Sequence, residues 1–164
     1  MGKAKQPTAG TPAVLALRRA GVDHRVLTYD HDPRAESFGL EAAHALGLEP
    51  AIVFKTLLVE ADGSLAVVIV PVDTTVDLKA AAVALGAKRA VMADPAAAER
   101  ATGYVVGGIS PLGQKKAHRT VIDESARSLA GMLVSGGRRG VDVELAPADL
   151  AALTRGAFAP IARR

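Results

Sequence analysis

The residues best suited to bind or transform a ligand stand together in one short stretch, residues 107–116, which reads GGISPLGQKK. Its glycines let a ligand approach the backbone closely, its proline stiffens the chain, and its lysines follow directly. A tight structural connection followed by solvated lysines would have the same composition. We predict a loop that holds a ligand.

Two well-known catalytic loops have similar glycine spacing, and neither fits this stretch. A phosphate-binding P-loop needs lysine and then a hydroxyl residue where Gln114 and Lys115 stand. A serine nucleophile elbow needs glycine where Leu112 stands, and its oxyanion hole uses the amide of the next residue, which Pro111 lacks. The sequence therefore excludes a Walker-type ATPase and argues against Ser110 as an acyl-enzyme nucleophile.

Three further polar residues interrupt apolar runs. Lys55 lies within AIVFKTLLV, where a buried strand would have to give it a partner or a wet cavity; a lysine that protects an edge strand is the alternative. Asp142 lies within GVDVELA, and Tyr29 closes an alternating run. Both are candidates for a site, and both could instead be hydrogen-bonded structural residues.

Composition excludes several classes of chemistry. The chain of 164 residues contains no cysteine, so disulfides, thiolate metal ligands and a cysteine nucleophile are excluded. The four histidines have no metal-binding spacing, and we expect neither a metal nor another cofactor. No apolar run reaches the roughly 18 residues of a spanning helix and no signal peptide begins the chain, so we expect a cytoplasmic protein away from membranes.

Basic residues occur in pairs, although the net charge is only +3. Lys115 and Lys116 form one pair, and Arg138 and Arg139 form another. Paired cations can hold phosphates, but they can equally be solvated surface charge. A nucleic-acid partner is permitted by the composition.

Hairpins and helices alternate along the chain after a disordered tail at residues 1–10. Capping residues and glycine stops predict helices, and alternating β-rich runs predict strands, with a hairpin turn at Asp62 and Gly63. The predicted helices are 11–21, 37–48, 76–87, 94–103 and 147–156, and the predicted strands lie within 24–30, 51–71, 88–92, 104–108, 119–123 and 131–146. We predict one mixed α+β domain over residues 11–164 with a largely antiparallel sheet.

Several of these blocks together resemble the YbaK/EbsC family, in particular its Cys-tRNA(Pro) deacylase branch. The blocks that carry the resemblance are YDHDPRAESFG (29–39), FKTLLV (54–59), VDLKAAAVALGAKRAVMADP (76–95), residues 101–116, VSGGRRGVDVELAPADL (134–150) and the terminal FAPIARR. The resemblance runs from about residue 11 to the end, with Ala101 standing where the family often has a hydroxyl residue. It implies a β-barrel-like sheet wrapped by helices, similar to the editing domain of bacterial prolyl-tRNA synthetases.

The resemblance also implies an activity and a mechanism. The expected reaction is hydrolysis of mischarged Cys-tRNA(Pro), with Cys-tRNA(Cys) as a further candidate substrate, in trans beside prolyl-tRNA synthetase. The cysteinyl thiol of the substrate would attack its own ester, because the chain offers no nucleophile. The alternatives are an Ala-tRNA(Pro) editing deacylase, a non-catalytic module that binds aminoacyl-tRNA or a nucleotide, and a hydrolase of small esters.

Family positions transfer onto this chain residue by residue. The resemblance implies a catalytic group of Lys55, Gly107, Gly108 and Ser110. It implies a substrate-binding wall of Tyr29, Phe38, Thr56, Ile109, Pro111, Ser135, Gly137 and Asp142. We expect Lys115, Lys116, Arg138 and Arg139 to contact tRNA phosphates without reading the sequence.

Overall fold

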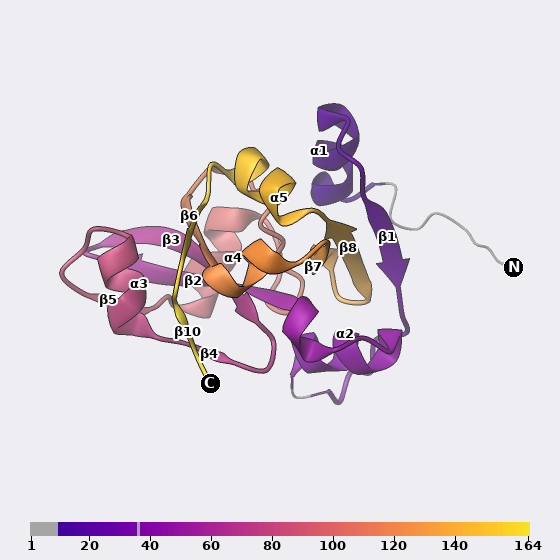
Figure 1. Ribbon diagram of the computed structural model, residues 1–164, viewed down its shortest axis with the longest axis horizontal. Helices are drawn as coiled ribbons and strands as arrows, with labels where there is room; N and C mark the ends of the chain where they lie inside the picture. The colour runs from indigo at the N-terminus through magenta and orange to yellow at the C-terminus, as the bar shows by residue number, and fades with distance from the viewer. Residues whose placement is uncertain (1–9, 36) are drawn as a thin grey trace, which may run out of the picture.

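The computed structural model describes residues 10–35 and 37–164. The predicted disordered tail lies outside the described residues, except for Gly10. The chain folds into helices packed around separate β-sheets, with the C-terminus beside β4 and β10 (Figure 1).

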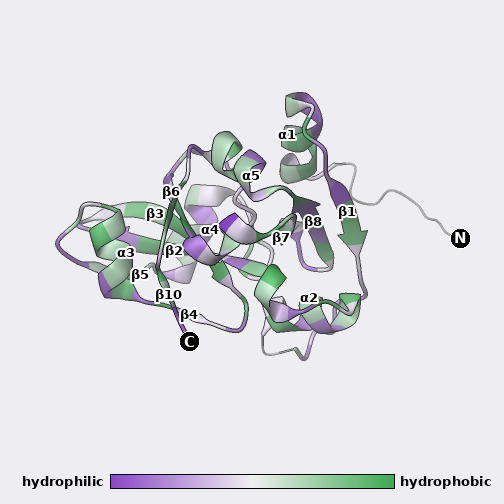
Figure 2. Cartoon of the chain, in the orientation of Figure 1, coloured by the Kyte–Doolittle hydropathy of each residue, from purple (hydrophilic) through white to green (hydrophobic). Residues whose placement is uncertain are grey.

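Three of the helices end at the predicted glycines Gly21, Gly47 and Gly103, and Thr11 and Asp94 are N-caps as the sequence predicts. Thr11 Oγ1 accepts a hydrogen bond from the Val14 amide, and Gly21 ends the first helix with a left-handed φ of 67°. Hydrophobic and hydrophilic residues alternate around α1 and α2 (Figure 2). The helices are α1 (Pro12–Ala20), α2 (Phe38–Leu46), α3 (Leu78–Ala84), α4 (Pro95–Thr102) and α5 (Pro147–Thr154), with 3-10 turns at Pro50–Ile52 and Glu124–Ser128. Within the described ranges, none is long and apolar enough to cross a membrane.

The strands form three sheets in which antiparallel pairs predominate. They are β1 (Arg25–Thr28), β2 (Phe54–Ala61), β3 (Ser64–Pro71), β4 (Thr75–Val76), β5 (Ala90–Met92), β6 (Arg119–Asp123), β7 (Met132–Arg138), β8 (Val141–Leu145), β9 (Ala157–Ala159) and β10 (Ala162–Arg163). The sheet orders are β5-β2-β3-β6-β9, β1-β8-β7 and β10-β4, and among the strands of the described residues only β3–β6 and β6–β9 pair in parallel. The α+β class is confirmed, but the strands within residues 10–35 and 37–164 do not close into a barrel. An isolated parallel β-bridge between Val53 and Leu133 joins the two larger sheets.

The β2–β3 hairpin is the centre of the molecule. Asp62 and Gly63 form its turn with φ values of 49° and 87°, as the sequence predicts. Side chains of β2 alternate between the two faces of the sheet: Phe54 and Leu58 enter one hydrophobic cluster, and Val59 enters another. The hairpin therefore supports a core on both of its faces.

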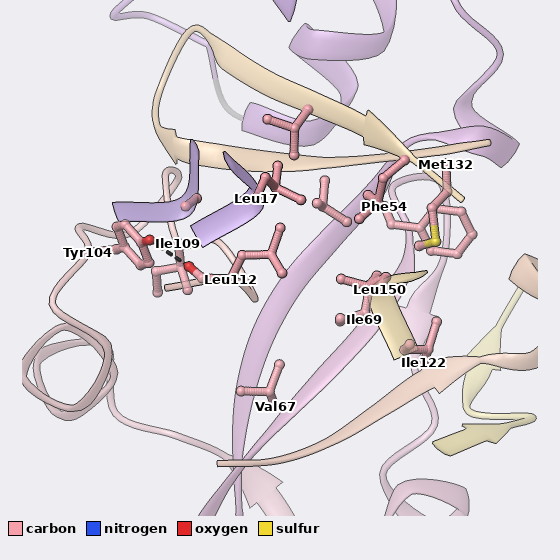
Figure 3. Close-up of a cluster of buried hydrophobic side chains, with 14 of the residues drawn as sticks. Leu17, Phe54, Val67, Ile69, Tyr104, Ile109, Leu112, Ile122, Met132 and Leu150 are labelled. Atoms are coloured by element: carbon pink, nitrogen blue, oxygen red, sulfur yellow. Dashed lines mark hydrogen bonds between the residues drawn. The ribbon is translucent and has the colours of Figure 1, made fainter. Parts of the chain in front are cut away.

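The larger core lies between the five-stranded sheet and β7–β8. Phe54 and Ile69 of the hairpin pack there with Met132, with Leu17 of α1 and with Leu150 of α5 (Figure 3). On the opposite face, α3 and the C-terminal segment cover the sheet. A third, smaller cluster joins α2 to the ends of β2, β3 and β7.

The predicted strand over residues 104–108 is wrong, because this segment is a loop. Hydrogen bonds that involve side chains hold it in place, and it does not pair with any strand of the described residues. The Tyr104 hydroxyl donates to the Leu112 carbonyl at 2.6 Å, the dashed line in Figure 3. The Val106 amide donates to Glu99 Oε2 at 2.8 Å. Two short strands near the C-terminus, β9 and β10, were not predicted, and α5 ends at Arg155 (φ 55°) instead of at Gly156.

Candidate functional site

A pocket of about 170 Å³ lies between the start of β2, the start of α2, the loop after α4 and the β7–β8 pair. Its wall consists of Tyr29, Ser37, Phe38, Gly39, Ala42, Val53, Phe54, Lys55, Thr56, Leu57, Val106, Gly107, Ile109, Ser135 and Asp142. Lys55 and Gly107, the two residues on which the sequence argument depends most, thus share one cavity. Its volume is below the roughly 300 Å³ at which pockets for drug-sized ligands begin.

Lys55 lies on the part of β2 that keeps one edge open. β3 pairs with β2 from Phe54 onward, with Lys55 opposite Val70, whereas β5 pairs with β2 only from Val59. Burial lowers the pKa of the half-buried Lys55 ammonium, and the negative charge of Asp73 partly opposes this effect. The result is a cation that is partly stripped of water at the pocket wall.

Asp142 is the most deeply buried charged residue of the pocket, with 6% of its surface exposed. It lies on β8 between Leu27 of β1 and Ser135 of β7. Burial raises the pKa of its carboxyl to about 7. Burial, and then the charge of Asp142, raise the pKa of the neighbouring Tyr29 hydroxyl to about 12. No hydrogen bond or ion pair among the described residues reaches the Asp142 side chain, so this carboxyl has no cation partner within that part of the chain.

Thr56 adds a second polar group without a partner. Its Oγ1 is buried and makes no hydrogen bond within the part of the chain that the structure describes. Leaving a buried hydroxyl unpaired is costly, and such a group needs an explanation. A polar atom of a ligand in the pocket would provide the missing partner.

The glycine-rich loop contributes Gly107 and Ile109 to the pocket, whereas its other predicted residues lie behind the wall. The Gly108 amide donates to the Val105 carbonyl at 2.9 Å, and a Cβ at this position would approach Arg138 Cα to 2.7 Å. Ser110 is fully buried, and its Oγ accepts from the Leu112 amide. These contacts assign Gly108 and Ser110 to the support of the loop.

Pro111 and Gly137 also lie outside the pocket wall. Gly137 has a φ of 111° in an irregular part of β7, and its amide donates to Ser135 Oγ at 3.1 Å. This bond holds the Ser135 side chain at the edge of the pocket. Pro111, within the loop, is buried.

The four predicted phosphate contacts separate into two locations. Arg139 lies at the pocket, where its Nε and Nη2 donate to the Val106 carbonyl at 3.1 and 2.6 Å and its guanidinium lies 4.4 Å from the centre of the Phe38 ring. Arg138 is exposed beside it and makes its own interaction. Lys115 and Lys116 are exposed at the far end of the loop, outside the pocket.

Sequence reasoning missed residues that shape the start of α2. A Cβ at Gly39 would lie 2.4 Å from Val72 Cγ1, so only glycine lets α2 pack this closely against the end of β3. Glu41 accepts from His31 Nδ1 at 2.9 Å and also from the Asp32 amide. A glycine within a predicted helix was the available signal for Gly39. Within the described residues there is no group of three or more potential metal ligands.

The aminoacyl-tRNA editing domain family matches residues 33–153, which include every residue of the pocket wall except Tyr29. A protein of Enterococcus faecalis (strain ATCC 700802 / V583), named provisionally as the Cys-tRNA(Pro)/Cys-tRNA(Cys) deacylase EbsC, is 40% identical over 120 residues, 73% of each chain. A crystal structure described provisionally as a trans-editing enzyme for prolyl tRNA synthetase has a TM-score of 0.84 at 23% identity, covering 98% of this chain and 100% of that chain.

A second crystal structure, of a hypothetical protein, has a TM-score of 0.80 at 25% identity and covers 90% of this chain and 96% of that chain. The likeness to these structures shows that the fold is shared along nearly the whole chain.

Proposed function

The chain belongs to the aminoacyl-tRNA editing domain family, and from this membership we propose that it is a deacylase that removes mischarged cysteine from tRNA(Pro). Cys-tRNA(Cys) is a second substrate of the same chemistry. The enzyme acts in trans, with prolyl-tRNA synthetase as its partner. The names of the E. faecalis relative and of the trans-editing structure support this proposal.

The observation that carries the proposal is the composition of the pocket. Its wall combines an ammonium, a carboxyl and a glycine loop, but its described residues include no histidine, and the chain contains no cysteine. At about 170 Å³ it holds roughly six water volumes, which suits one aminoacyl group. Such a site can hold an ester in place but cannot easily supply the attacking atom.

The substrate therefore supplies its own nucleophile. The cysteinyl sulfur attacks the carbonyl carbon of its own ester, a carbon–sulfur bond forms, and the bond from this carbon to the ribose oxygen breaks. The thiol proton passes to the departing ribose oxygen, so the products are free tRNA and a cyclic thioester that water later opens. Holding sulfur and carbonyl together is a proximity effect, which is worth several orders of magnitude in rate.

Named side chains orient the substrate in this reaction. The Asp142 carboxylate accepts hydrogen bonds from the α-ammonium of the amino acid. The positive charge of this ammonium lowers the pKa of the Asp142 carboxyl, which opposes the effect of burial. Thr56 and Tyr29 form hydrogen bonds with the remaining polar atoms of the substrate. The amides of Gly107 and Ile109 stabilise the developing oxyanion. Lys55 binds the ribose or phosphate of the terminal adenosine at the mouth of the pocket.

Deacylation of Cys-, Ser- and Ala-tRNA(Pro) tests the proposal, with and without prolyl-tRNA synthetase. We expect rapid loss of cysteine with a cyclic thioester among the products. Turnover of the serine ester should be slow, because a hydroxyl is a weaker nucleophile than a thiol, and the alanine ester should be stable.

Each alternative has its own result in this assay. Equal turnover of Ala-tRNA(Pro) would establish editing by a bound water. Binding of aminoacyl-tRNA without turnover would establish a non-catalytic module. Hydrolysis of free cysteine esters at a rate that tRNA does not improve would establish a small-molecule esterase.

A further inference from the structure

A second concave surface lies at the opposite end of the β2–β3 hairpin from the pocket. This open groove of about 790 Å³, here called the basic groove, lies between the hairpin turn, α4 and the start of β6. Its lining residues are Gly63, Ser64, Leu65, Ala97, Arg100, Ala101, Lys116, Ala117, His118 and Arg119. No acidic residue is among them.

The charges of the basic groove are available to a ligand. Arg100, Lys116 and Arg119 are exposed, and only one nitrogen of Arg119 is occupied, by the Leu85 carbonyl. The two acids next to lining residues in the sequence are hydrogen-bonded to backbone amides: Glu99 accepts from the Val106 amide, and Asp62 accepts from the amides of Lys88 and Arg89. Three cations thus line the groove without an acidic partner in its wall.

The lining favours a nucleic-acid backbone over a protein. Protein interfaces are anchored by buried aromatic or large apolar side chains, but Leu65 is the only large apolar residue of this groove among those described. Among the described residues of the groove there is no Phe, Tyr or Trp, and the half-buried imidazole of His118 is the one aromatic ring on which a base could stack. Exposed cations around an open groove fit phosphates, which carry charge at regular intervals.

The distance to the pocket determines what can occupy both sites. Lys55 lies opposite Val70, and Leu65 lies five residues along the same strand, roughly 17 Å away at about 3.4 Å per residue. This distance exceeds the Debye length of about 8 Å at physiological salt, so the groove barely attracts a small ligand in the pocket. One polyanion that extends over both sites can use both.

One loop connects the two sites. Val106, Gly107 and Ile109 line the pocket, and Lys116 lines the basic groove ten residues after Val106. The loop is held rigid between them, because the Tyr104 hydroxyl donates to the Leu112 carbonyl and the Gln114 side chain donates to the Ser110 carbonyl. The two sites therefore have a fixed separation.

We propose that the basic groove binds the sugar–phosphate backbone of the acceptor arm of tRNA while the aminoacylated end of the same molecule occupies the pocket. This inference rests on the proposed function and adds to it a second RNA-binding site. Burial, and then the charge of Lys116, lower the pKa of His118, which leaves the three permanent cations as the phosphate ligands. The groove gives affinity for tRNA without contributing to the chemical step.

A double variant, Arg100→Ala with Lys116→Ala, tests the groove. We expect its Kd for uncharged tRNA(Pro) to rise roughly threefold to thirtyfold, as two exposed charge contacts warrant. The slope of log K against log salt should fall by about 1.8, because two fewer phosphates are neutralised. With Cys-tRNA(Pro), KM should rise while kcat is unchanged. With the 3′-cysteinyl ester of adenosine, which is too short to span both sites, kcat/KM should equal that of the wild type.

The matched control is Arg18→Ala with Lys79→Ala, which removes one exposed arginine and one exposed lysine from helix surfaces outside both sites. Equal tRNA affinity and salt slope in both double variants would overturn the inference. So would normal tRNA binding with loss only of stimulation by the synthetase, because the groove would then bind protein. If the wild-type protein binds tRNA through the basic groove but cleaves no ester, the proposed deacylase function is wrong, whereas the tRNA-binding role of the groove is supported.

Discussion

At the scale of single residues, the buried Asp142 carboxyl makes the stability of the fold depend on pH. Its pKa of about 7 lies above the unfolded value of 3.8, so the folded state binds more protons between these values. The stabilisation that the protonated Asp142 carboxyl gives to the folded state is fully present below about pH 4 and is lost as pH rises through about 7. The total is on the order of 4 kcal/mol.

We expect Asp142→Asn to remove this dependence. Urea denaturation of wild type and variant between pH 4 and pH 8 measures it, and the difference between the two free energies of unfolding isolates Asp142 from other titrating groups. The wild type should lose stability relative to the variant as pH rises. Parallel curves would mean that the carboxylate is stabilised by a partner when ionised.

Lys55 separates function from stability. Because burial disfavours its charged form and only Asp73 opposes this, the ammonium contributes little to folding. Lys55→Met keeps the apolar stem and removes the charge. We expect a free energy of unfolding that is unchanged or slightly higher, with kcat/KM for Cys-tRNA(Pro) lower on the order of 100-fold. Full activity in a folded Lys55→Met protein would remove Lys55 from the mechanism; Lys79→Met is the matched control.

At the scale of elements, the pocket is closed by a contact between three segments. Arg139 from the β7–β8 turn bonds Val106 in the loop and stacks on Phe38 of α2. A Cβ at Gly107 would lie 2.6 Å from Arg139 Nε and 2.7 Å from Phe38 Cδ2, so glycine is required for this closure. Two of the five Arg139 donors serve the fold, and the others remain for a phosphate.

Arg139→Lys distinguishes closure of the pocket from phosphate binding. Lysine keeps the charge but loses the forked hydrogen bonds and the planar stacking. If closure dominates, kcat should fall by roughly tenfold, the size expected for a lost charged hydrogen bond, with the salt slope of tRNA binding unchanged. If phosphate binding dominates, Arg139→Lys should behave as wild type and Arg139→Gln should lower the slope by about 1.

The sequence predicts the elements whose signals are local. Caps at Thr11 and Asp94 and the turn at Asp62 and Gly63 act within a few residues, and the structure has each of them. The apolar alternation at residues 104–108 imitates a strand, but whether a strand forms depends on a partner, and here side chains bind the backbone instead. β9 and β10 are too short to have a period and exist through pairing with β6 and β4.

The same limit applies to the site. Lys55 and Asp142 stand out because a charge interrupts an apolar run, which needs only the sequence. By contrast, the close packing of Gly39 and the contact of Arg139 with Phe38 depend on segments that are distant in the chain, so no local sequence pattern predicts them. The basic groove likewise combines cations from α4 and the start of β6, which only the fold brings together.

At the scale of the whole molecule, one carboxylate ties the C-terminal segment to the central sheet. Asp123 at the end of β6 is 4% exposed, and its Oδ1 accepts from the Ile161 amide at 3.0 Å and the Ala162 amide at 2.9 Å. Ile161 is fully buried against the face that α3 also covers. The segment that carries β9 and β10 is therefore fixed at its centre by a side chain.

Asp123→Ala should release this segment. The loss of the acceptor for two amides, one of them buried, should lower the free energy of unfolding by about 2–4 kcal/mol.

Burial acts to raise the Asp123 pKa, but hydrogen bonds from Ser125, Ile161 and Ala162 outweigh it and lower the pKa below the usual 3.8. The contribution is thus complete above about pH 4 and is lost as pH falls through the lowered pKa. Urea denaturation at pH 7 and pH 3 measures both effects, and hydrogen exchange should show faster exchange at residues 157–163 in the variant. Exchange that stays slow there, with an unchanged free energy, would mean that strand pairing alone holds the C-terminus.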